Sequence, residues 1–402
     1  MEAKPQSSTS MATPWGAMSI LFFVHFVVDS HGTFFSPLIP ILREKFQFSL
    51  ATAGLLVSIQ SMTSALSQPF AATMVDRWPG LPWLAVGIVG SSVAFTAIGW
   101  SPSFSGVALA ILVGGLLFGL CHPDMAARSG RLSKAHSSLS VSVFVTGGRM
   151  GFAFGPIIAI AIAKYLGMEW LWIYVLVSLT VMVLVVWHLP NPPKPRGKKK
   201  GTSSGLWAAL RHARFPISLL FGVAVVRALI MGNLGGFFPT LFVDYGMGLW
   251  SGGFANTVLF FSGALGVMAG GYWGDRVEKR TIILIGMVIG LSGMVAFLVF
   301  PLKFAFFSLA IVGLGNFIPM GVSVTLAQEL LPDHRGFASS LTLGGGWIIS
   351  SFSSVPIAAV AERIGLLTAF WVLPVFLALG VTIAFMMPRE KEKSGIAQSA
   401  QS

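Results

Sequence analysis

Long apolar runs separated by short polar breaks dominate the pattern along this chain. A helix needs about 20 mostly apolar residues to cross the hydrocarbon core of a bilayer. The runs predict two groups of six membrane-spanning helices, parted by a polar stretch after the sixth. The spans are expected at residues 15–41, 50–74, 83–100, 104–123, 139–166, 170–189, 215–242, 250–272, 281–299, 304–328, 337–360 and 366–387. The least marked boundary is the break between the third and fourth spans, which rests on Ser101-Pro102-Ser103 alone.

Composition supports a membrane protein. Hydrophobic residues make up 54% of the chain and charged residues 10%, whereas a soluble domain has about 25% charged residues. The single cysteine, Cys121, permits no internal disulfide. The first thirteen residues are polar and lack the basic start of a secretory signal, so the apolar run that follows is interpreted as a retained helix.

The distribution of positive charge predicts the orientation in the membrane. With the N-terminus in the cytoplasm, 19 of the 26 Lys and Arg residues fall on the inner side and 5 on the outer side. Cytoplasmic loops carry such an excess, so both termini are expected in the cytoplasm. The same scattering between apolar runs argues against nucleic acid binding. We expect a tail at 1–14, bundles at 15–189 and 215–387, a basic linker at 190–214 and a tail at 388–402. A solvated linker is the main interpretation of 190–214, and a lipid-sensing switch is the alternative, because basic runs attract anionic headgroups.

An internal repeat links the two groups of spans. The pair Asp76-Arg77 follows the second span and Asp275-Arg276 follows the eighth. Duplicated halves are how many transporters are built. Gly271 to Arg280 resembles the loop signature of the major facilitator superfamily, while the first copy departs from it at Ala72, Pro79 and Gly80. The resemblance implies an all-α polytopic fold, with 12 transmembrane helices in two pseudo-symmetric six-helix bundles that open alternately to either side.

In that family the loop carboxylate faces the start of a helix in the other half. A carboxylate there is stabilised by the helix dipole. The resemblance implies that Asp76 faces the eleventh span near Gly336, and that Asp275 faces the fifth near Ser137. Such contacts would exist only when the cytoplasmic side is closed. The alternative is that these charges, with Arg77 and Arg276, serve membrane topology alone.

The fifth span contains Gly151-x-x-x-Gly155-Pro156, which resembles the antiporter signature of drug-exporting members. Small residues four apart let two helices approach closely, and proline bends the helix there. The trailing glycines of the signature are replaced by Ala159 and Ile160. Generic helix packing is therefore the alternative interpretation.

Further stretches resemble one branch, the fosmidomycin-resistance-type exporters. They are His25 to Asp29, Gln68-Pro69, His122-Pro123, Gly147-Gly148 and Ala327 to Pro332. This resemblance implies a multi-pass exporter of small, often anionic molecules in the bacterial inner membrane, driven by the proton gradient. One residue departs from it, because Arg149 stands where that branch is expected to have an uncharged polar residue.

Three ionisable groups are predicted near the membrane centre. Counted along their helices, Arg149 and His25 lie about 15 Å deep and Arg227 about 18 Å. Charged groups at that depth normally face a watery cavity or one another. We therefore expect Arg149 and Arg227, with His25, to bind an anionic substrate between the halves. The alternative is a structural partner for each, such as Asp29 for Arg149.

Proton coupling requires groups that titrate near neutral pH. Imidazoles do so, and a desolvated carboxylate can. The candidates are His25, Asp29, which lies one turn from His25, and His31, although His31 could instead be a polar residue at headgroup level. Candidates for a cytoplasmic gate also include His122 and Asp124 at the end of the fourth span and Glu329 at the end of the tenth.

These observations predict a proton-coupled antiporter that exports a small anionic or drug-like molecule, working as a monomer without cofactor or metal. A proton-coupled uptake symporter for an organic or phosphorylated anion is the main alternative. A membrane-embedded enzyme is disfavoured because no short His/Glu metal motif occurs. A sensor that binds without transporting is the remaining alternative.

Overall fold

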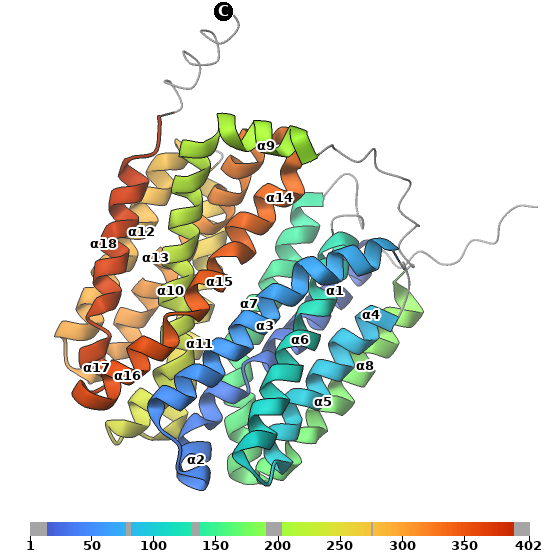
Figure 1. Ribbon diagram of the computed structural model, residues 1–402, viewed down its shortest axis with the longest axis vertical. Helices are drawn as coiled ribbons and strands as arrows, with labels where there is room; N and C mark the ends of the chain where they lie inside the picture. Colours follow the sequence, from blue (N-terminus) through green and yellow to red (C-terminus); the bar gives the residue numbers. More distant parts are fainter. Residues whose placement is uncertain (1–13, 78–81, 130–136, 190–202, 275, 390–402) are drawn as a thin grey trace, which may run out of the picture.

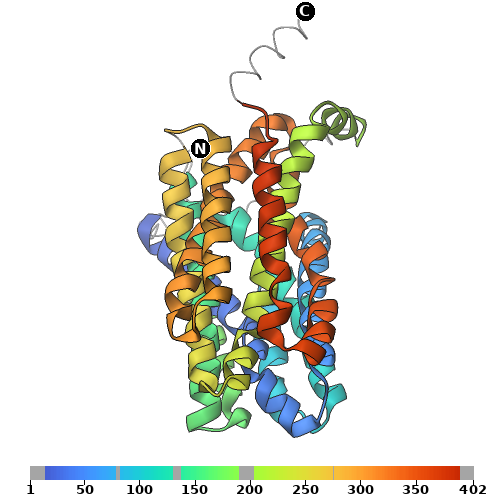
Figure 2. The ribbon, with the colours of Figure 1, turned by 90° about the vertical axis from the view of Figure 1, so that its left-hand side faces the viewer.

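The molecule is a bundle of membrane-length helices. The computed structural model describes residues 14–77, 82–129, 137–189, 203–274 and 276–389, and within these ranges it contains no β-strand. Two groups of helices lie side by side, one from residues 14–189 and one from 203–389 (Figure 1 and Figure 2). This arrangement confirms the predicted all-α fold class.

Six spans form the first half, several of them built from consecutive short helices. They are α1 (Pro14–Gly32) with α2 (Phe35–Phe46), α3 (Leu50–Arg77), α4 (Pro82–Ala85) with η1 (Val86–Gly90), α5 (Ser91–Thr96) and η2 (Ala97–Trp100), α6 (Phe104–Ser129), α7 (Ser137–Tyr165), and η3 (Met168–Trp172) with α8 (Ile173–His188).

The second half is preceded by α9 (Ser203–His212). Its spans are α10 (Arg214–Asp244), α11 (Gly248–Gly274), α12 (Lys279–Val299), η4 (Leu302–Phe304) with α13 (Ala305–Leu330), and α17 (Leu366–Ala369) with α18 (Val372–Phe385). Between the last two lies a broken span made of η5 (Pro332–His334), α14 (Arg335–Ser340), η6 (Leu341–Gly345), α15 (Gly346–Ser351) and α16 (Ser354–Ile364).

The expected and observed spans agree apart from two details. Among the described residues, eleven helices are long and apolar enough to cross a bilayer, and the broken pair at 337–364, bent by 44°, makes a twelfth. The first span is longer than expected, since α2 extends it to Phe46. The eleventh is broken between α15 and α16, at Phe352 and Ser353. Earlier in the same span, η6 forms a bulge with π-helical hydrogen bonding. Such bulges bend helices.

A short helix that the sequence analysis did not anticipate occupies the linker. α9 lies across the same end of the bundle at which α18 ends (Figure 1). Its Trp207 side chain is 71% exposed, and Arg211 and His212 are exposed as well. Tryptophan is common at membrane interfaces. The basic run at 194–200 lies outside the described residues.

Contacts between the halves are found between the membrane centre and the predicted outer end. The hydrogen bonds that cross there include Ser36 Oγ to Gly235 O at 2.6 Å, Ala51 N to Glu362 Oε1 at 3.0 Å, and Thr257 Oγ1 to Ala153 O at 2.7 Å. Gly54 also packs directly against the backbone of Ser354. The predicted outer side of this conformation is therefore closed.

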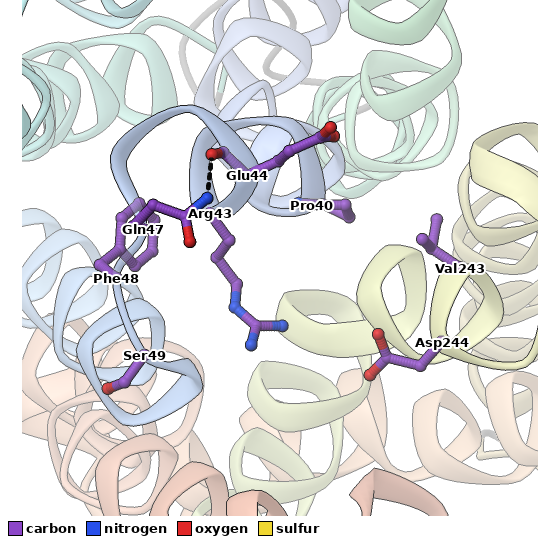
Figure 3. Close-up of a pocket in the computed structure, with 8 residues that line it drawn as sticks. All are labelled: Pro40, Arg43, Glu44, Gln47, Phe48, Ser49, Val243 and Asp244. Carbon is purple, nitrogen blue, oxygen red and sulfur yellow. Dashed lines mark hydrogen bonds between the residues drawn. The ribbon is translucent and has the colours of Figure 1, made fainter.

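A pocket of about 460 Å³ lies at the outer end of this contact zone, between α2 and the end of α10. Arg43 extends into it with its guanidinium turned toward Asp244 of the other half (Figure 3). The Nε atom of Arg43 is buried without a hydrogen-bond partner. Charged groups of both halves thus meet at the outer closure.

The Glu362 contact yields a first prediction. Its carboxylate accepts a hydrogen bond from the first turn of α3, where the helix dipole favours negative charge. Because the contact joins the halves only when the outer side is closed, Glu362→Gln should shift the population toward outer opening. A cysteine placed at Ser354, which is 3% exposed and packs against Gly54 of the other half, should then react severalfold faster with a membrane-impermeant maleimide. Glu44→Gln, which removes a charge from the same end without touching Ala51, should leave labelling unchanged. Equal labelling in both variants would contradict the prediction.

Candidate functional site

Two arginines from opposite halves meet on one aromatic ring. Arg149 of α7 places its Cζ atom 4.9 Å from the centroid of Phe317, and Arg227 of α10 places its Cζ atom 5.6 Å from it. A cation over an aromatic face is attracted by the ring quadrupole. Phe317 therefore holds two like charges close to one another.

The helix α13 positions both guanidinium groups. Arg227 donates from Nε to the carbonyl oxygen of Asn316 at 2.6 Å, and Asn316 donates from Nδ2 to the carbonyl oxygen of Arg227 at 3.3 Å. Arg149 donates from Nη2 to Met320 Sδ at 3.5 Å. Within the described part of the chain, neither arginine has a carboxylate within 4.0 Å. The arrangement can bind an anion with two guanidinium groups.

A second cluster lies beside the arginines. Asp29 of α1 places Oδ2 3.3 Å from His25 Nε2 and Oδ1 3.1 Å from His122 Nε2 of α6. His25 and Asp29 are 8% and 4% exposed. The carboxylate interacts electrostatically with Arg149, but its direct partners are the two histidines. The expected alternative of an Asp29–Arg149 pair is therefore not what the structure contains.

The glycine motif of α7 gives this cluster its space. A Cβ atom built at Gly148 would lie 2.5 Å from Asp29 Oδ2, and one built at Gly151 would lie 2.9 Å from Asp29 Cβ. One built at Gly155 would overlap the carbonyl oxygen of Ser30. The Gly151-x-x-x-Gly155 spacing thus packs α7 against α1 within one half, and Pro156 continues in the same helix.

His31 occupies a different place from the cluster. It is completely buried in the first half, its Nε2 lies 2.8 Å from Ser91 Oγ, and Phe95 and Tyr174 pack around its ring. His31 therefore lies outside the Asp29 cluster, with which it interacts electrostatically, and its expected part in proton coupling stays a prediction.

The residues expected at a cytoplasmic gate have different partners in the structure and do not form one group. Asp124 accepts a hydrogen bond from Arg128 Nε at 2.9 Å, and Glu329 pairs with Lys279 at 3.1 Å. Arg276 packs over the ring of Tyr272. Asp275 and the side chains of Asp76 and Arg77 lie outside the described residues. His122, also expected at the gate, belongs to the Asp29 cluster.

Two members of the site were not assigned to it from sequence. Phe317 is one of 33 phenylalanines, and nothing in the sequence around it distinguishes it from the others. His122 was expected at the helix end because Pro123 follows it. In the structure α6 continues through Pro123 to Ser129, so His122 stays inside the helix. No sequence signal distinguishes Phe317, and the continuation of α6 past Pro123 is visible only in the structure.

Among the described residues, the side chains of this cluster place nitrogen and oxygen atoms close enough together to hold a metal ion. One ligand atom from each of His25, Asp29 and His122 lies within 4.8 Å of the others. Two imidazoles and a carboxylate are donors that Zn²⁺ accepts. Their direct contacts with one another also suit proton sharing, which the distances of 3.1 and 3.3 Å permit.

Relatives and solved structures resemble the chain over nearly its whole length. A 25% identical relative, "Uncharacterized MFS-type transporter YfnC" of Bacillus subtilis (strain 168), aligns over 94% of each chain. The "Fosmidomycin resistance protein" of Escherichia coli (strain K12) is 21% identical, over 94% of this chain and 95% of that one. The latter confirms the resemblance stated from the motifs.

The fold is shared with solved transporters. A bacterial homologue of the human lysosomal transporter Spinster, in an inward-facing and unoccupied conformation, has a TM-score of 0.72 at 16% identity, covering 95% of this chain and 98% of that one. A point mutant of the nucleoside transporter NupG has a TM-score of 0.73 at 14% identity, covering 92% and 98%.

The family model described as Major Facilitator Superfamily matches residues 21–354 and 220–401. Helix number, two-bundle architecture and whole-chain relatives agree with that match. The chain therefore belongs to the Major Facilitator Superfamily and is a multi-pass membrane transporter rather than an enzyme.

Proposed function

We propose that this protein is a proton-coupled secondary transporter that exports a small anionic or drug-like molecule by alternating access across the bacterial inner membrane. The proposal of an anionic substrate rests on the pair Arg149 and Arg227. The two guanidinium groups come from opposite halves, lie on one ring, and have no carboxylate partner among the described residues. Buried charges need compensation, and an anionic ligand supplies it.

Export as the direction is supported by likeness alone. The chain is similar over nearly its whole length to a fosmidomycin resistance protein, and removing a toxic compound from the cell is one way to confer resistance. A substrate held by both halves would be exposed to one side and then to the other as the halves move, which is the geometry that alternating access requires. The termini are assigned to the cytoplasm by the charge distribution.

We assign proton coupling to Asp29 and His25 beside the anion site. A carboxylate between imidazoles can gain and lose protons. Arg149 interacts electrostatically with Asp29, so the protonation state of the cluster and the charge of the bound ligand affect one another. His31 lies on the same helix but contacts Ser91 instead of Asp29, so we do not assign it a direct part in proton coupling.

One observation favours a second candidate, the uptake symporter. The cluster becomes more positive when it takes up a proton, and it lies next to Arg149. Protonation should therefore strengthen anion binding, which favours movement of proton and anion together. Exchange of one for the other requires the opposite, because a proton must then displace the substrate. Direction measurements separate these candidates.

The decisive test of function measures flux in proteoliposomes with an imposed pH gradient. Fosmidomycin and a panel of phosphonates and phosphorylated metabolites serve as probes. An exporter driven by exchange moves the probe against the proton flow, whereas a symporter moves it with the flow. Flux of every probe that ignores the gradient would overturn proton coupling in both candidates.

Asp29→Asn should remove the dependence of flux on the pH gradient while leaving probe binding in place. The amide cannot ionise, so the cluster can no longer exchange the proton that it shares. We expect gradient-driven accumulation to fall at least tenfold, with exchange of probe across the membrane at equal pH retained. Glu169→Gln, which neutralises an exposed carboxylate of the same half, is the control. Full gradient dependence in Asp29→Asn would contradict the assignment.

A further inference from the structure

The hydrogen bonds of the two cluster histidines determine which ring nitrogen carries the proton. His25 Nδ1 lies 2.8 Å from the carbonyl oxygen of Phe144, and His122 Nδ1 lies 2.8 Å from the carbonyl oxygen of Phe118. A carbonyl oxygen only accepts hydrogen bonds. Both Nδ1 atoms must therefore carry hydrogen, and both rings present Nε2 toward Asp29.

This tautomer leaves the carboxylate facing two nitrogen lone pairs when both rings are neutral. Asp29 Oδ1 lies 3.1 Å from His122 Nε2, and Oδ2 lies 3.3 Å from His25 Nε2. A lone pair against a carboxylate oxygen at hydrogen-bond distance is repulsive, and burial makes an uncompensated contact costly. Each contact becomes attractive once a proton lies between its two atoms. The cluster therefore contains two proton positions.

The two positions differ in geometry. The His122–Asp29 contact satisfies hydrogen-bond angles as well as distance, whereas the longer His25–Asp29 contact is an ion pair by distance alone. His25 is stacked on Phe144 with ring centroids 4.0 Å apart, and the ring of His122 packs against Phe118. The first proton is thus better placed between His122 and Asp29 than between His25 and Asp29.

The described surroundings contain few other charges. The titratable or charged groups that pack around the cluster, on its own helix and on α6, α7 and α8, are His31, Cys121, Arg149 and Tyr174. Of these, the guanidinium of Arg149 carries a permanent positive charge. The cluster itself carries a charge of −1 with no shared proton, 0 with one and +1 with two.

We propose that His122 is a proton-coupling residue that holds the resting proton with Asp29, and that the His25–Asp29 contact is a second proton position filled during the cycle. In the first position a proton from the aqueous solution is bonded to His122 Nε2, which then donates a hydrogen bond to Asp29 Oδ1. In the second position a further proton is bonded to His25 Nε2, which donates a hydrogen bond to Asp29 Oδ2. The inference rests on the proposed proton coupling and extends it to a third residue and to two protons.

Nitrogen-15 NMR of histidine-labelled protein in lipid, without substrate, tests the inference directly. Ring nitrogen shifts distinguish a neutral ring from one protonated at both nitrogens. Near neutral pH we expect His122 to be doubly protonated and His25 to be neutral with its proton on Nδ1. Acidification should convert His25 to the doubly protonated form. The seven histidines are assigned by single replacements, and His188→Gln, at the exposed end of α8, is the control.

Variants separate a shared proton from an ordinary histidine. His122→Gln should remove the doubly protonated signal, and Asp29→Asn should convert it to a neutral one. His25→Gln should leave it in place, which keeps the test valid if the His122 variant fails to fold. A neutral His122 in the unmodified protein, a charged His122 that ignores Asp29→Asn, or stoichiometric zinc in the purified protein would each overturn the inference.

The same preparations are then assayed for flux driven by a pH gradient. The expected NMR pattern without gradient-driven flux would refute the proposed coupling but leave the proton positions intact. Gradient-driven flux with full activity in His122→Gln would refute the role of His122 but leave proton-coupled transport intact.

Discussion

Arg149→Gln and Arg227→Gln are each expected to weaken binding of an anionic substrate by one to two orders of magnitude. A hydrogen bond to a charged group contributes about 1.5–3 kcal/mol, so the loss of one guanidinium should weaken binding about 10-fold to 150-fold. The two residues come from different halves and share Phe317. Because both must contact one ligand, the double variant should lose measurable binding entirely.

Thermal unfolding in the presence of anionic ligands is the measurement. A ligand that binds the folded protein raises its stability by mass action, so true ligands should raise the unfolding midpoint of the parent protein and not of either variant. Arg211→Gln on α9, an exposed arginine far along the chain from Arg149, should respond like the parent. Equal midpoint shifts in the parent and in Arg149→Gln would contradict a shared anion site.

Gly155→Ala is expected to destabilise the first half strongly. Its added methyl group would overlap the carbonyl oxygen of Ser30 and lie 2.7 Å from Ser30 Cα, so the backbones of α1 and α7 must separate. Overpacking of this kind costs about 1–3 kcal/mol, occasionally more. Gly148→Ala should cost less stability but disturb Asp29 and His25 directly, because its methyl group meets their side chains.

The matched control is Gly321→Ala on α13. No atom lies within 4 Å of a Cβ atom built there, and alanine is favoured over glycine in a helix interior by roughly 0.5–1 kcal/mol. The unfolding midpoint should therefore fall for Gly155→Ala and stay level or rise for Gly321→Ala. A fall of similar size in both variants would show that close approach of α1 and α7 is not what Gly155 provides.

The proposed proton-coupling cluster and the proposed anion site are connected through one stretch of α7. Gly148 packs against the Asp29 cluster, and its neighbour Arg149 reaches Phe317 and Met320 of the other half. A change of charge at the cluster therefore acts on a residue that contacts both halves. This short path makes a common effect of pH on substrate affinity and on the conformational equilibrium a direct expectation.

Some features of the site were accessible from the chain alone because they depend on depth along a helix. Arg149, Arg227 and His25 lie at similar depth by simple counting, and the structure brings Arg149 and Arg227 to one ring. The surroundings of His31 and His122 were not accessible in this way. Depth does not determine the direction in which a side chain points, so His31 packs against Ser91 and His122 points toward Asp29.

The amino-acid sequence by itself determined the twelve spans, the division into halves and the family, because the bilayer requires about 20 apolar residues per crossing wherever they occur. Tertiary structure decided which side chains of the site contact one another. Asp29 and His122 are 93 residues apart along the chain, and Arg149 and Phe317 come from different halves. Such contacts depend on the rotation and closeness of packed helices, which Gly151 and Gly155 permit but which no local pattern encodes.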